Sequence, residues 1–327
     1  MSSSALLSPT AESAADLETV QAECSEFESE LTAALIMRPR SIAPKFFYDT
    51  AGSRLFDRIC DLPEYYPTRT EFALLARHAP EMAALMGTGA DLVEFGAGSL
   101  TKVRLLLDAL EQPRRFIPVD ISADHLHAGA AMLRADYPGL DVKPLAADFT
   151  QPLALPPSHR RVGFFPGSSI GNFSPDEAVQ FLRMAATSLR GGGMLVGVDL
   201  VKDPAVLHRA YNDSAGVTAA FNRNLLLRAN RELGCDFDAE QFAHYAFYDP
   251  RQRRGEMHLV SRRRQVVTLR GQRFEFADGE SLHTENSYKF TVEGFQSLAL
   301  RAGFHPQRVW CDAENQFSIH WLTLPVA

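Results

Sequence analysis

The chain has 327 residues, 46% of them hydrophobic and 22% charged, a globular composition long enough for two domains or for one domain with a large insertion. A formal net charge of −7 and only local runs of arginine argue against a nucleic-acid partner. Four widely spaced cysteines predict neither a zinc site nor a disulfide framework, and the lack of a long apolar run predicts no membrane span.

The first part of the chain is expected to be helical with two loops. Apolar residues recur at helical spacing over 16–37, and residues 53–61 show the same pattern. Residues 1–15 are rich in Ser and Ala and lack the features of a signal peptide, so we expect a frayed N-terminus and a cytoplasmic protein. Prolines make 62–71 a loop, and Thr68 or Thr70 is the expected cap of a helix over about 70–86.

The next hundred residues alternate between strands and helices. The expected strands are 91–95, 115–121, 140–147, 161–165 and 193–200, and the helices between them are 100–111, 122–137 and 175–190. Continuous apolar strands that alternate with helices indicate a parallel sheet covered on both faces. The class predicted is therefore α/β.

The pattern changes after residue 201. Residues 203–235 favour helices, and 243–287 alternate as strands with Gly255 and Gly271 as turn candidates. A helix over 292–302 and two strands, 307–311 and 317–324, follow. We therefore expect a core made of residues 16–201 and 287–327, interrupted by an inserted α+β substrate-recognition domain at 202–286.

Three elements at the expected carboxyl ends of strands predict a nucleoside-binding site. Glu94-Phe95-Gly96-Ala97-Gly98 allows close approach of a ligand, Asp120 suits two ribose hydroxyls, and Asp148-Phe149 suits an adenine. This spacing fits NAD as well as S-adenosylmethionine. Thr101 replaces the third glycine of the dinucleotide pattern, and Glu94 would repel a pyrophosphate but can face a cationic amino-acid group. S-adenosylmethionine is therefore the preferred cofactor.

Five blocks carry a resemblance to a known family. They are Pro44–Asp49, Leu62–Glu71, Gly167–Asn172, Tyr211 with Ala215–Asn222, and Thr284–Phe290. From about residue 30 to the C-terminus the chain resembles the histidine Nα-methyltransferases of ergothioneine biosynthesis. The resemblance implies a class I S-adenosylmethionine-dependent methyltransferase, with a Rossmann-like seven-stranded sheet. It also implies conversion of L-histidine into hercynine, its Nα-trimethyl betaine, with three S-adenosylmethionine molecules.

The resemblance also implies roles for individual residues. The cofactor positions are Tyr48, Gly96, Lys102, Asp120, Asp148 and Phe149. The substrate positions are Asn172 and Tyr211 for the carboxylate, Tyr65 near the imidazole, Glu285 and Ser287 on the ring nitrogens, and Met257 in the pocket wall. Tyr48 and the backbone near Gly167 are our candidates for the catalytic environment of the amine.

The chemistry requires positioning more than acid–base catalysis. An in-line displacement at a sulfonium methyl group needs a neutral amine, and alignment of two reactants contributes about 7–11 kcal/mol. Histidine is the expected small-molecule partner, and no metal, nucleic acid or membrane is expected. Three alternatives stay open: another amino acid such as tryptophan or a thiol-substituted histidine, a Rossmann-like dehydrogenase, and a non-catalytic sensor. The oligomeric state is open, and a monomer is compatible with the sequence.

Overall fold

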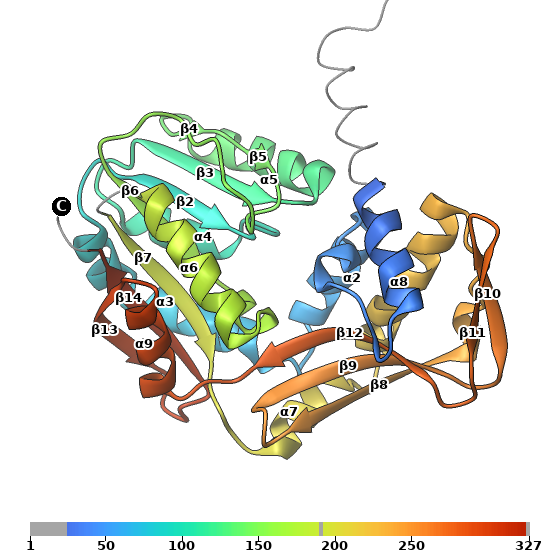
Figure 1. The fold of residues 1–327 in the computed structure, drawn as a ribbon. Coiled ribbons are helices and arrows are strands. Elements are labelled where there is room, and N and C mark those ends of the chain that lie inside the picture. Colours follow the sequence, from blue (N-terminus) through green and yellow to red (C-terminus); the bar gives the residue numbers. More distant parts are fainter. Residues whose placement is uncertain (1–24, 190–191, 325–327) are drawn as a thin grey trace, which may run out of the picture.

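The computed structural model describes residues 25–189 and 192–324. The chain forms two lobes on either side of an opening (Figure 1). One lobe holds the central sheet, and the other holds the N-terminal helix of the described chain together with the inserted region. The predicted helix over 16–37 is described only from residue 25, and it ends at residue 36. The expected frayed N-terminus lies outside the described residues.

The central sheet has the order β13-β14-β7-β6-β2-β3-β4, and β5 also pairs with β3. Its strands are β2 (Asp91–Phe95), β3 (Arg115–Asp120), β4 (Asp141–Val142), β5 (Leu145–Ala146), β6 (Arg161–Phe165), β7 (Gly193–Asp199), β13 (His305–Cys311) and β14 (Phe317–Thr323). All are parallel except β14, which runs antiparallel to β7 and to β13. Seven strand positions with one antiparallel strand near the edge are the topology of class I methyltransferases, so the predicted α/β class is confirmed.

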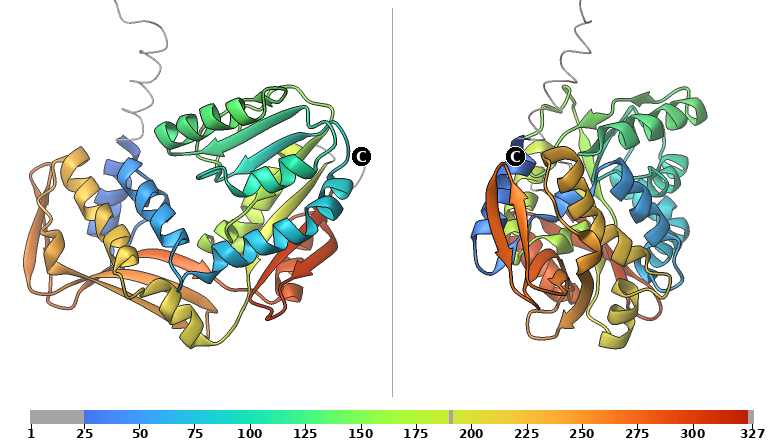
Figure 2. Two further views of the ribbon diagram at one scale, coloured as in Figure 1. Left: turned by 180° about the vertical axis from the view of Figure 1, so that it is seen from behind. Right: turned by 90° about the vertical axis from the view of Figure 1, so that its right-hand side faces the viewer.

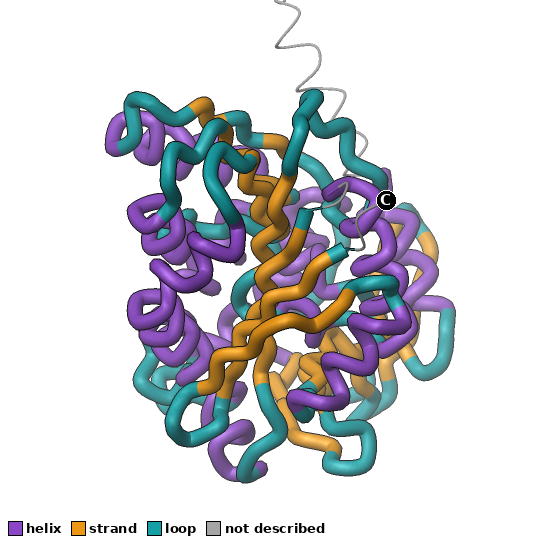
Figure 3. The backbone as a smooth tube through the Cα atoms, turned by 90° about the vertical axis from the view of Figure 1, so that its left-hand side faces the viewer, coloured by secondary structure: helices purple, strands orange, loops and turns teal. Residues whose placement is uncertain are grey.

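Helices cover both faces of this sheet, as Figure 3 shows from the side. Three helices bury apolar side chains in the cluster on one face: α3 (Tyr66–Met86), α4 (Lys102–Ala109) and α5 (Ala123–Asp136). Two helices do so on the other face: α6 (Pro175–Leu189) and α9 (Val292–Arg301). Burial of the strands between two apolar layers explains why their sequences are continuously hydrophobic.

The second lobe is built around a sheet of three antiparallel strands with one short parallel strand at its edge (Figure 2). Its order is β1-β12-β9-β8, and a separate hairpin pairs β10 with β11. The strands are β1 (Arg40–Ser41), β8 (Phe242–Asp249), β9 (Arg254–Ser261), β10 (Gln265–Leu269), β11 (Gln272–Phe276) and β12 (Ser281–Tyr288). The helices of this lobe include α2 (Thr50–Cys60), α7 (Pro204–Tyr211) and α8 (Val217–Leu233), with short 3-10 turns η1 (Pro44–Phe47) and η3 (Ala239–Gln241).

The N-terminal segment packs with the inserted region. Phe27, Phe47 and Ile59 share one apolar cluster with Phe221 and Leu225 of α8. Strand β1 also extends the second sheet by pairing in parallel with β12. We therefore propose to group residues 25–62 with 202–286, rather than with the sheet core in which the expected division had placed them.

Three local expectations were wrong. Helix α3 begins at Tyr66, with Pro67 in its first turn, and neither Thr68 nor Thr70 caps it. A proline is tolerated there because the first turn needs no backbone donor, so the proline that suggested a loop starts the helix instead. The strand expected over 140–147 is divided into β4 and β5 around Pro144, which cannot donate to the ladder.

Of the two glycines expected in turns, only one lies in a turn. Gly271 forms the β10–β11 turn with a φ of 79°, as expected. Gly255 is instead inside β9, opposite Ser287. A Cβ atom on Gly255 would lie 3.3 Å from the Tyr211 ring, so the glycine leaves room for that side chain.

Within the described residues no helix is both long and apolar enough to cross a membrane.

The shared cluster gives a stability prediction. Phe221 is buried, and its ring centroid lies 4.6 Å from that of Phe47. We expect Phe221→Ala to lower the free energy of unfolding by about 3–5 kcal/mol, because a large cavity would open between the N-terminal segment and α8. Leu227→Ala is the control on the same helix, since Leu227 is 49% exposed, and it should change stability by about 0.5 kcal/mol or less. Urea unfolding checks both; equal losses would contradict the shared core.

Candidate active site

A cleft of about 920 Å³ is lined by residues of both lobes. It lies at the ends of β2, β3 and β6, where ligands bind in open parallel sheets. Ten of the thirteen expected site residues line it: Tyr48, Tyr65, Gly96, Lys102, Asp120, Asp148, Phe149, Gly167, Asn172 and Glu285. The other three, Tyr211, Met257 and Ser287, are not part of its lining.

The turn after β2 is open toward the cleft. Gly96 and Gly98 have φ values of 68° and 53°, which other residues adopt only with strain. Asp120 accepts a hydrogen bond from the Gly98 N–H at 3.0 Å and one from the Ser122 N–H at 2.9 Å. A Cβ on Gly98 would meet no atom within 4 Å. The turn therefore leaves room for a ligand beside a fixed carboxylate, as a ribose requires.

Phe149 and Asp148 form the neighbouring part of the cleft. A Cβ on Gly96 would be 3.3 Å from the Phe149 ring, which places that ring directly over the turn. Asp148 accepts hydrogen bonds from Lys45 Nζ at 2.9 Å and from the Thr150 N–H at 2.8 Å. Burial favours the neutral acid, but these bonds lower the pKa of Asp148 below its usual value. Asp148 thus stays charged, and an adenine amino group would share it with Lys45.

Lys102 is bound to a carboxylate that the sequence analysis gave no role. Its Nζ lies 2.5 Å from Glu71 Oε2, and Glu71 is fully buried. The same carboxylate accepts the Gly167 N–H at 2.9 and 3.1 Å. Burial opposes the charge on Lys102, but Glu71 raises its pKa. Glu71 therefore fixes both Lys102 and the turn at Gly167, and its place at the end of the block Leu62–Glu71 was the available signal.

Glu94 provides a second carboxylate at the cleft. It is 1% exposed, and its Oε2 atom has no hydrogen-bond partner in the described part of the chain. Burial, opposed in part by the charge of Lys102, raises the pKa of Glu94 well above its usual value. An orphaned buried carboxylate is costly unless a ligand pairs with it. The cationic groups of S-adenosylmethionine fit this position, and Asp120 and Phe149 fit its ribose and adenine.

Aromatic rings form the wall contributed by the second lobe. Phe56 makes edge contacts with Tyr48 and Tyr65, at centroid distances of 5.6 and 6.3 Å. Burial, with the nearby charges of Glu285 and Asp120, raises the pKa of Tyr48 well above its usual range. The Tyr48 hydroxyl therefore keeps its proton at neutral pH, and it lies near the carboxylates of both Glu285 and Asp120.

Glu285 is the acid of the second lobe. Its carboxylate lines the cleft and makes no hydrogen bond or ion pair within residues 25–189 and 192–324. Burial raises the pKa of Glu285 to about 7, although the charge of Lys289 opposes the shift. Such a group is poised to pair with a donor from a ligand.

Asn172 ends a short turn in the part of the cleft lining contributed by the central sheet. It is the last residue of η2 (Ser169–Asn172), which follows the left-handed residues Gly167 and Ser168. The Ser168 hydroxyl accepts a hydrogen bond from the Asp199 N–H at 2.8 Å. The turn after β6 is thereby fixed to the end of β7, which presents Asn172 and the Gly167 backbone to the cleft.

Tyr211, Ser287 and Met257 lie behind the lining. Tyr211 and Ser287 are hydrogen-bonded to each other at 2.7 Å, and both bind Lys289. Met257 pairs with Glu285 across the β9–β12 ladder and is 3% exposed, so it packs in the apolar cluster. Direct contact of these three residues with a substrate stays a prediction.

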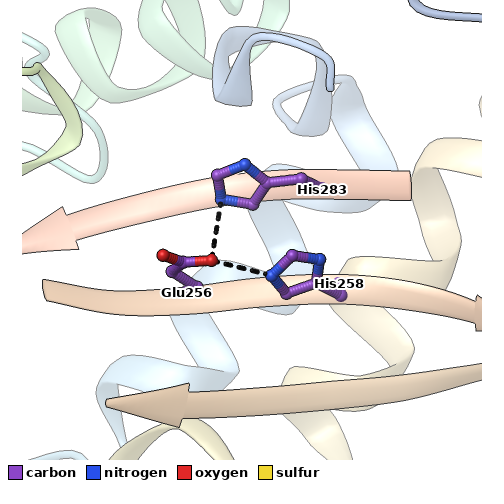
Figure 4. Close-up of side chains that lie close together, drawn as sticks. All are labelled: Glu256, His258 and His283. Atoms are coloured by element: carbon purple, nitrogen blue, oxygen red, sulfur yellow. Dashed lines mark hydrogen bonds and ion pairs between the residues drawn. The ribbon is translucent and has the colours of Figure 1, made fainter. Parts of the chain in front are cut away.

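A cluster beside the cleft contains Glu256, His258 and His283 on strands β9 and β12, and His283 is part of the cleft lining (Figure 4). Glu256 Oε2 lies 3.0 Å from His258 Nε2 and 4.0 Å from His283 Nε2. The two rings stack at 4.6 Å with an angle of 18°, so their nitrogen lone pairs run nearly parallel. Arg254 already pairs with Glu256 at 2.6 Å. We assign no ion to this cluster, and the expectation of no metal stays a prediction.

Comparisons with known proteins agree with this geometry. Residues 27–324 match the family described as histidine-specific, S-adenosylmethionine-dependent methyltransferases. A histidine N-alpha-methyltransferase of Mycolicibacterium smegmatis is 43% identical over 297 residues, covering 89% of this chain and 92% of that protein. One from Mycobacterium tuberculosis is 42% identical over 288 residues, covering 86% and 89%. Ergothioneine biosynthesis protein 1 of Neurospora crassa is 30% identical over 308 residues, covering 87% of this chain and 33% of that protein.

The sheet topology and the cleft at the ends of its parallel strands define an S-adenosylmethionine-dependent class I methyltransferase. The dehydrogenase alternative is therefore wrong. Within that class, the chain belongs to the family of histidine-specific methyltransferases.

The raised pKa of Glu285 gives a pH-dependent stability prediction. In the unfolded chain the group titrates near 4.5, whereas in the folded chain it titrates at about 7. The folded state therefore binds more protons between these values, and stability falls as the pH rises through them. We expect Glu285→Gln to be up to about 3 kcal/mol more stable than the native chain at pH 8, and similar at pH 4.5.

Urea unfolding at both pH values tests this expectation. Glu240→Gln, at an exposed position of the same lobe, is the matched control and should leave stability unchanged at either pH. The quantity compared is the difference in free energy of unfolding between Glu285→Gln and the native chain. If this difference is the same at pH 8 and at pH 4.5, ionisation of Glu285 does not destabilise the fold, and the expectation is wrong.

Proposed function

We propose that the enzyme methylates the α-amino nitrogen of L-histidine and repeats the transfer until the trimethyl betaine hercynine is formed. The observation that carries this proposal is the unpaired, partly buried carboxylate of Glu285 in the cleft that also contains the residues expected to bind the cofactor. A neutral imidazole offers one N–H donor and one acceptor nitrogen. The match to a histidine-specific family and the names of the mycobacterial relatives support the same substrate.

The layout of the cleft supports this assignment. Glu285 lies on the second lobe, whereas Asn172 and Gly167 lie on the turn after β6. Histidine bound between these two parts of the lining would have its ring at Glu285 and its carboxylate at Asn172. The amine would then lie near Tyr48, whose pKa is raised by the charges of both Glu285 and Asp120.

The residues act by positioning and by excluding water. S-adenosylmethionine supplies an electrophilic methyl group when it is bound. With the donor bound, the amine lone pair would form a bond to the methyl carbon as the carbon–sulfur bond breaks, so the positive charge would pass from sulfur to nitrogen. After the first and second transfers the ammonium would release a proton to solvent before the next one. Tyr48 keeps its proton and offers its oxygen to the amine, and the Gly167 backbone limits the space around the nitrogen. Alignment of this kind contributes about 7–11 kcal/mol.

The aromatic wall suits repeated transfer. Each methyl group makes the ammonium product larger, less hydrated and less able to donate hydrogen bonds. The faces and edges of Tyr48, Phe56 and Tyr65 offer a surface for such a cation. A third transfer needs no base, because a tertiary amine carries no proton when it is reactive. The wall would therefore hold mono-, di- and trimethylated forms without rearrangement.

A product assay tests the substrate. Each of the twenty amino acids is incubated with enzyme and S-adenosylmethionine, and mass spectrometry detects gains of one to three methyl groups. We expect gains of up to three on histidine and none on tryptophan, whose indole has no acceptor nitrogen. Methylation of tryptophan in preference to histidine would refute the proposal, and so would absence of any methylated amino acid.

Glu285→Gln should lower kcat/KM for histidine by about 10–100-fold, because a hydrogen bond to a charged acceptor contributes about 1.5–3 kcal/mol. Glu240→Gln is again the matched control, and its kcat/KM should equal that of the native enzyme. Steady-state kinetics at pH 8 keeps Glu285 ionised. Unchanged turnover by the Glu285 variant would remove this residue from the substrate site.

Asp120→Asn should weaken cofactor binding by about 10–100-fold, because the ribose would lose a charged acceptor. Calorimetry with S-adenosylhomocysteine measures this loss. Asp124→Asn is the control, since Asp124 is exposed in the first turn of α5. Unchanged affinity in the Asp120 variant, with the fold intact by circular dichroism, would refute the ribose assignment.

A further inference from the structure

Lys289 is a buried cation directly behind the expected ring-binding residues. It follows β12, and its side chain is 1% exposed. Its ammonium lies 2.7 Å from Asp199 Oδ2, 2.8 Å from the Tyr211 hydroxyl and 2.7 Å from the Ser287 hydroxyl. An ammonium has three N–H donors, and each has a partner here.

The charge of Lys289 is fixed by its surroundings. Burial favours the neutral amine, but the Asp199 carboxylate and the Tyr211 hydroxyl raise the pKa of Lys289 above its usual range. Lys289 therefore acts only as a donor at any pH at which the protein is folded. Both hydroxyls beside it must accept.

The hydrogen bonds of Ser287 can then be counted. A hydroxyl has one proton and two lone pairs. The Ser287 oxygen accepts from Lys289 at 2.7 Å and from the Tyr211 hydroxyl, also at 2.7 Å. The phenol is the more acidic of the two hydroxyls, and it therefore donates. Both lone pairs of Ser287 are occupied, so its proton is its remaining means of binding a ligand.

The remaining direction for that proton is toward Glu285. Glu285 and Ser287 are two residues apart in β12, which pairs regularly with β9 from Glu285 to Tyr288, and Lys289 directly follows the strand. Side chains two residues apart in a strand share one face. Lys289 occupies one side of Ser287, and Glu285 lies on the other.

We propose that Lys289 is a positioning residue that makes Ser287 an obligatory donor, so that the site selects a neutral imidazole in one tautomer. Glu285 accepts the ring N–H, and Ser287 donates to the bare ring nitrogen. A protonated imidazolium has no bare nitrogen and is rejected. This inference rests on the proposed function, and it adds the protonation state in which the ring is bound.

Two isomers of pyrrolylalanine test the inference. Each keeps one ring N–H and replaces the other nitrogen by C–H, and together they place the N–H at either ring position. In the isomer whose N–H faces Glu285, the Ser287 proton would face a carbon and stay unpaired; in the other isomer that proton would face the ring N–H, and Glu285 would face a carbon. We expect kcat/KM at pH 8 to be at least about tenfold lower for both isomers than for histidine, because an unpaired polar group in the site penalises the wrong ligand.

Lys289→Gln should remove this discrimination. The Gln oxygen can accept the Ser287 proton, so a ligand without an acceptor nitrogen is no longer penalised. We expect the ratio of kcat/KM for histidine to that for the better isomer to fall at least about fivefold. Asp199 keeps Lys202 and Tyr66 as partners, so its carboxylate stays paired in the variant.

Lys202→Gln is the matched control. Lys202 binds the same Asp199 carboxylate, but its contacts are Tyr66 and the Leu200 carbonyl and not Ser287. Its substrate ratio should stay within about twofold of the native one. Thermal unfolding accompanies both variants, and Lys289→Met, which removes the ammonium donor without adding another, provides a second replacement if the Gln variant does not fold.

The outcomes separate the two proposals. A ratio that is unchanged in the Lys289 variants, while both substrates lose kcat/KM equally, would make Lys289 a purely structural residue and overturn the inference. A native enzyme that methylates histidine and the pyrrole isomers equally would also overturn it. If the native enzyme does not methylate histidine, the proposed function fails before the variants are compared.

Discussion

One buried carboxylate, Asp199 at the end of β7, joins the two lobes. Its oxygens bind the Tyr66 hydroxyl and the ammonium groups of Lys202 and Lys289. These residues lie at the three places where the chain passes between the lobes: the start of α3, the segment after β7 and the segment after β12. The Phe290 N–H also donates to the Asp199 carbonyl at 3.0 Å. The width of the cleft and the position of its second wall depend on this junction.

A junction made of ion pairs fixes the positions of the groups around a site more closely than an apolar junction would. Replacing buried ion pairs by apolar residues often leaves stability unchanged, so such pairs contribute less to stability than to geometry. Here burial lowers the pKa of Lys202 to about 8, while Asp199 raises that of Lys289. The two lysines on one carboxylate therefore differ: Lys289 is the permanent cation, and it is the one that contacts Ser287 and Tyr211.

The core could be predicted from the sequence because its strands and helices are specified by patterns of neighbouring residues. Alternating apolar strands and helices, with Gly96, Asp120 and Asp148 at strand ends, specify a parallel sheet and the edge at which it binds ligands. Errors arose where the partner of a segment is distant. Nothing in the periodicity of residues 25–60 shows that they pack on α8, and a proline near a helix start was mistaken for a loop residue.

In the site, too, the residues that line the cleft could be predicted, whereas the buried residues that hold them in place could not. The family resemblance placed ten residues at the cleft, five of them inside the family blocks, but spacing alone did not reveal what lies behind them. Glu71 and Lys289 stood inside quoted blocks, at Thr70-Glu71 and Tyr288-Lys289, without an assigned role. Both are buried charges that hold a neighbouring group, one at Gly167 and the other at Ser287. Their blocks contain other polar residues, so the sequence did not single them out; the burial of both charges, which would be too costly without partners, is visible only in the structure.

The balance of charge in the cleft follows the course of the proposed reaction. Glu94 and Glu285 have no charged partner among the described residues that contact them, whereas the cations Lys45 and Lys102 are paired with Asp148 and Glu71. Burial raises the pKa of Glu94 and favours its neutral form until a cation pairs with it, so a bound sulfonium donor would favour the ionised carboxylate. In the proposed reaction the charge lost from sulfur would reappear on nitrogen, beside Tyr48 and Phe56, where rings can hold it. Glu94 beside the donor and the aromatic rings beside the amine would thus match where the positive charge begins and where it finishes.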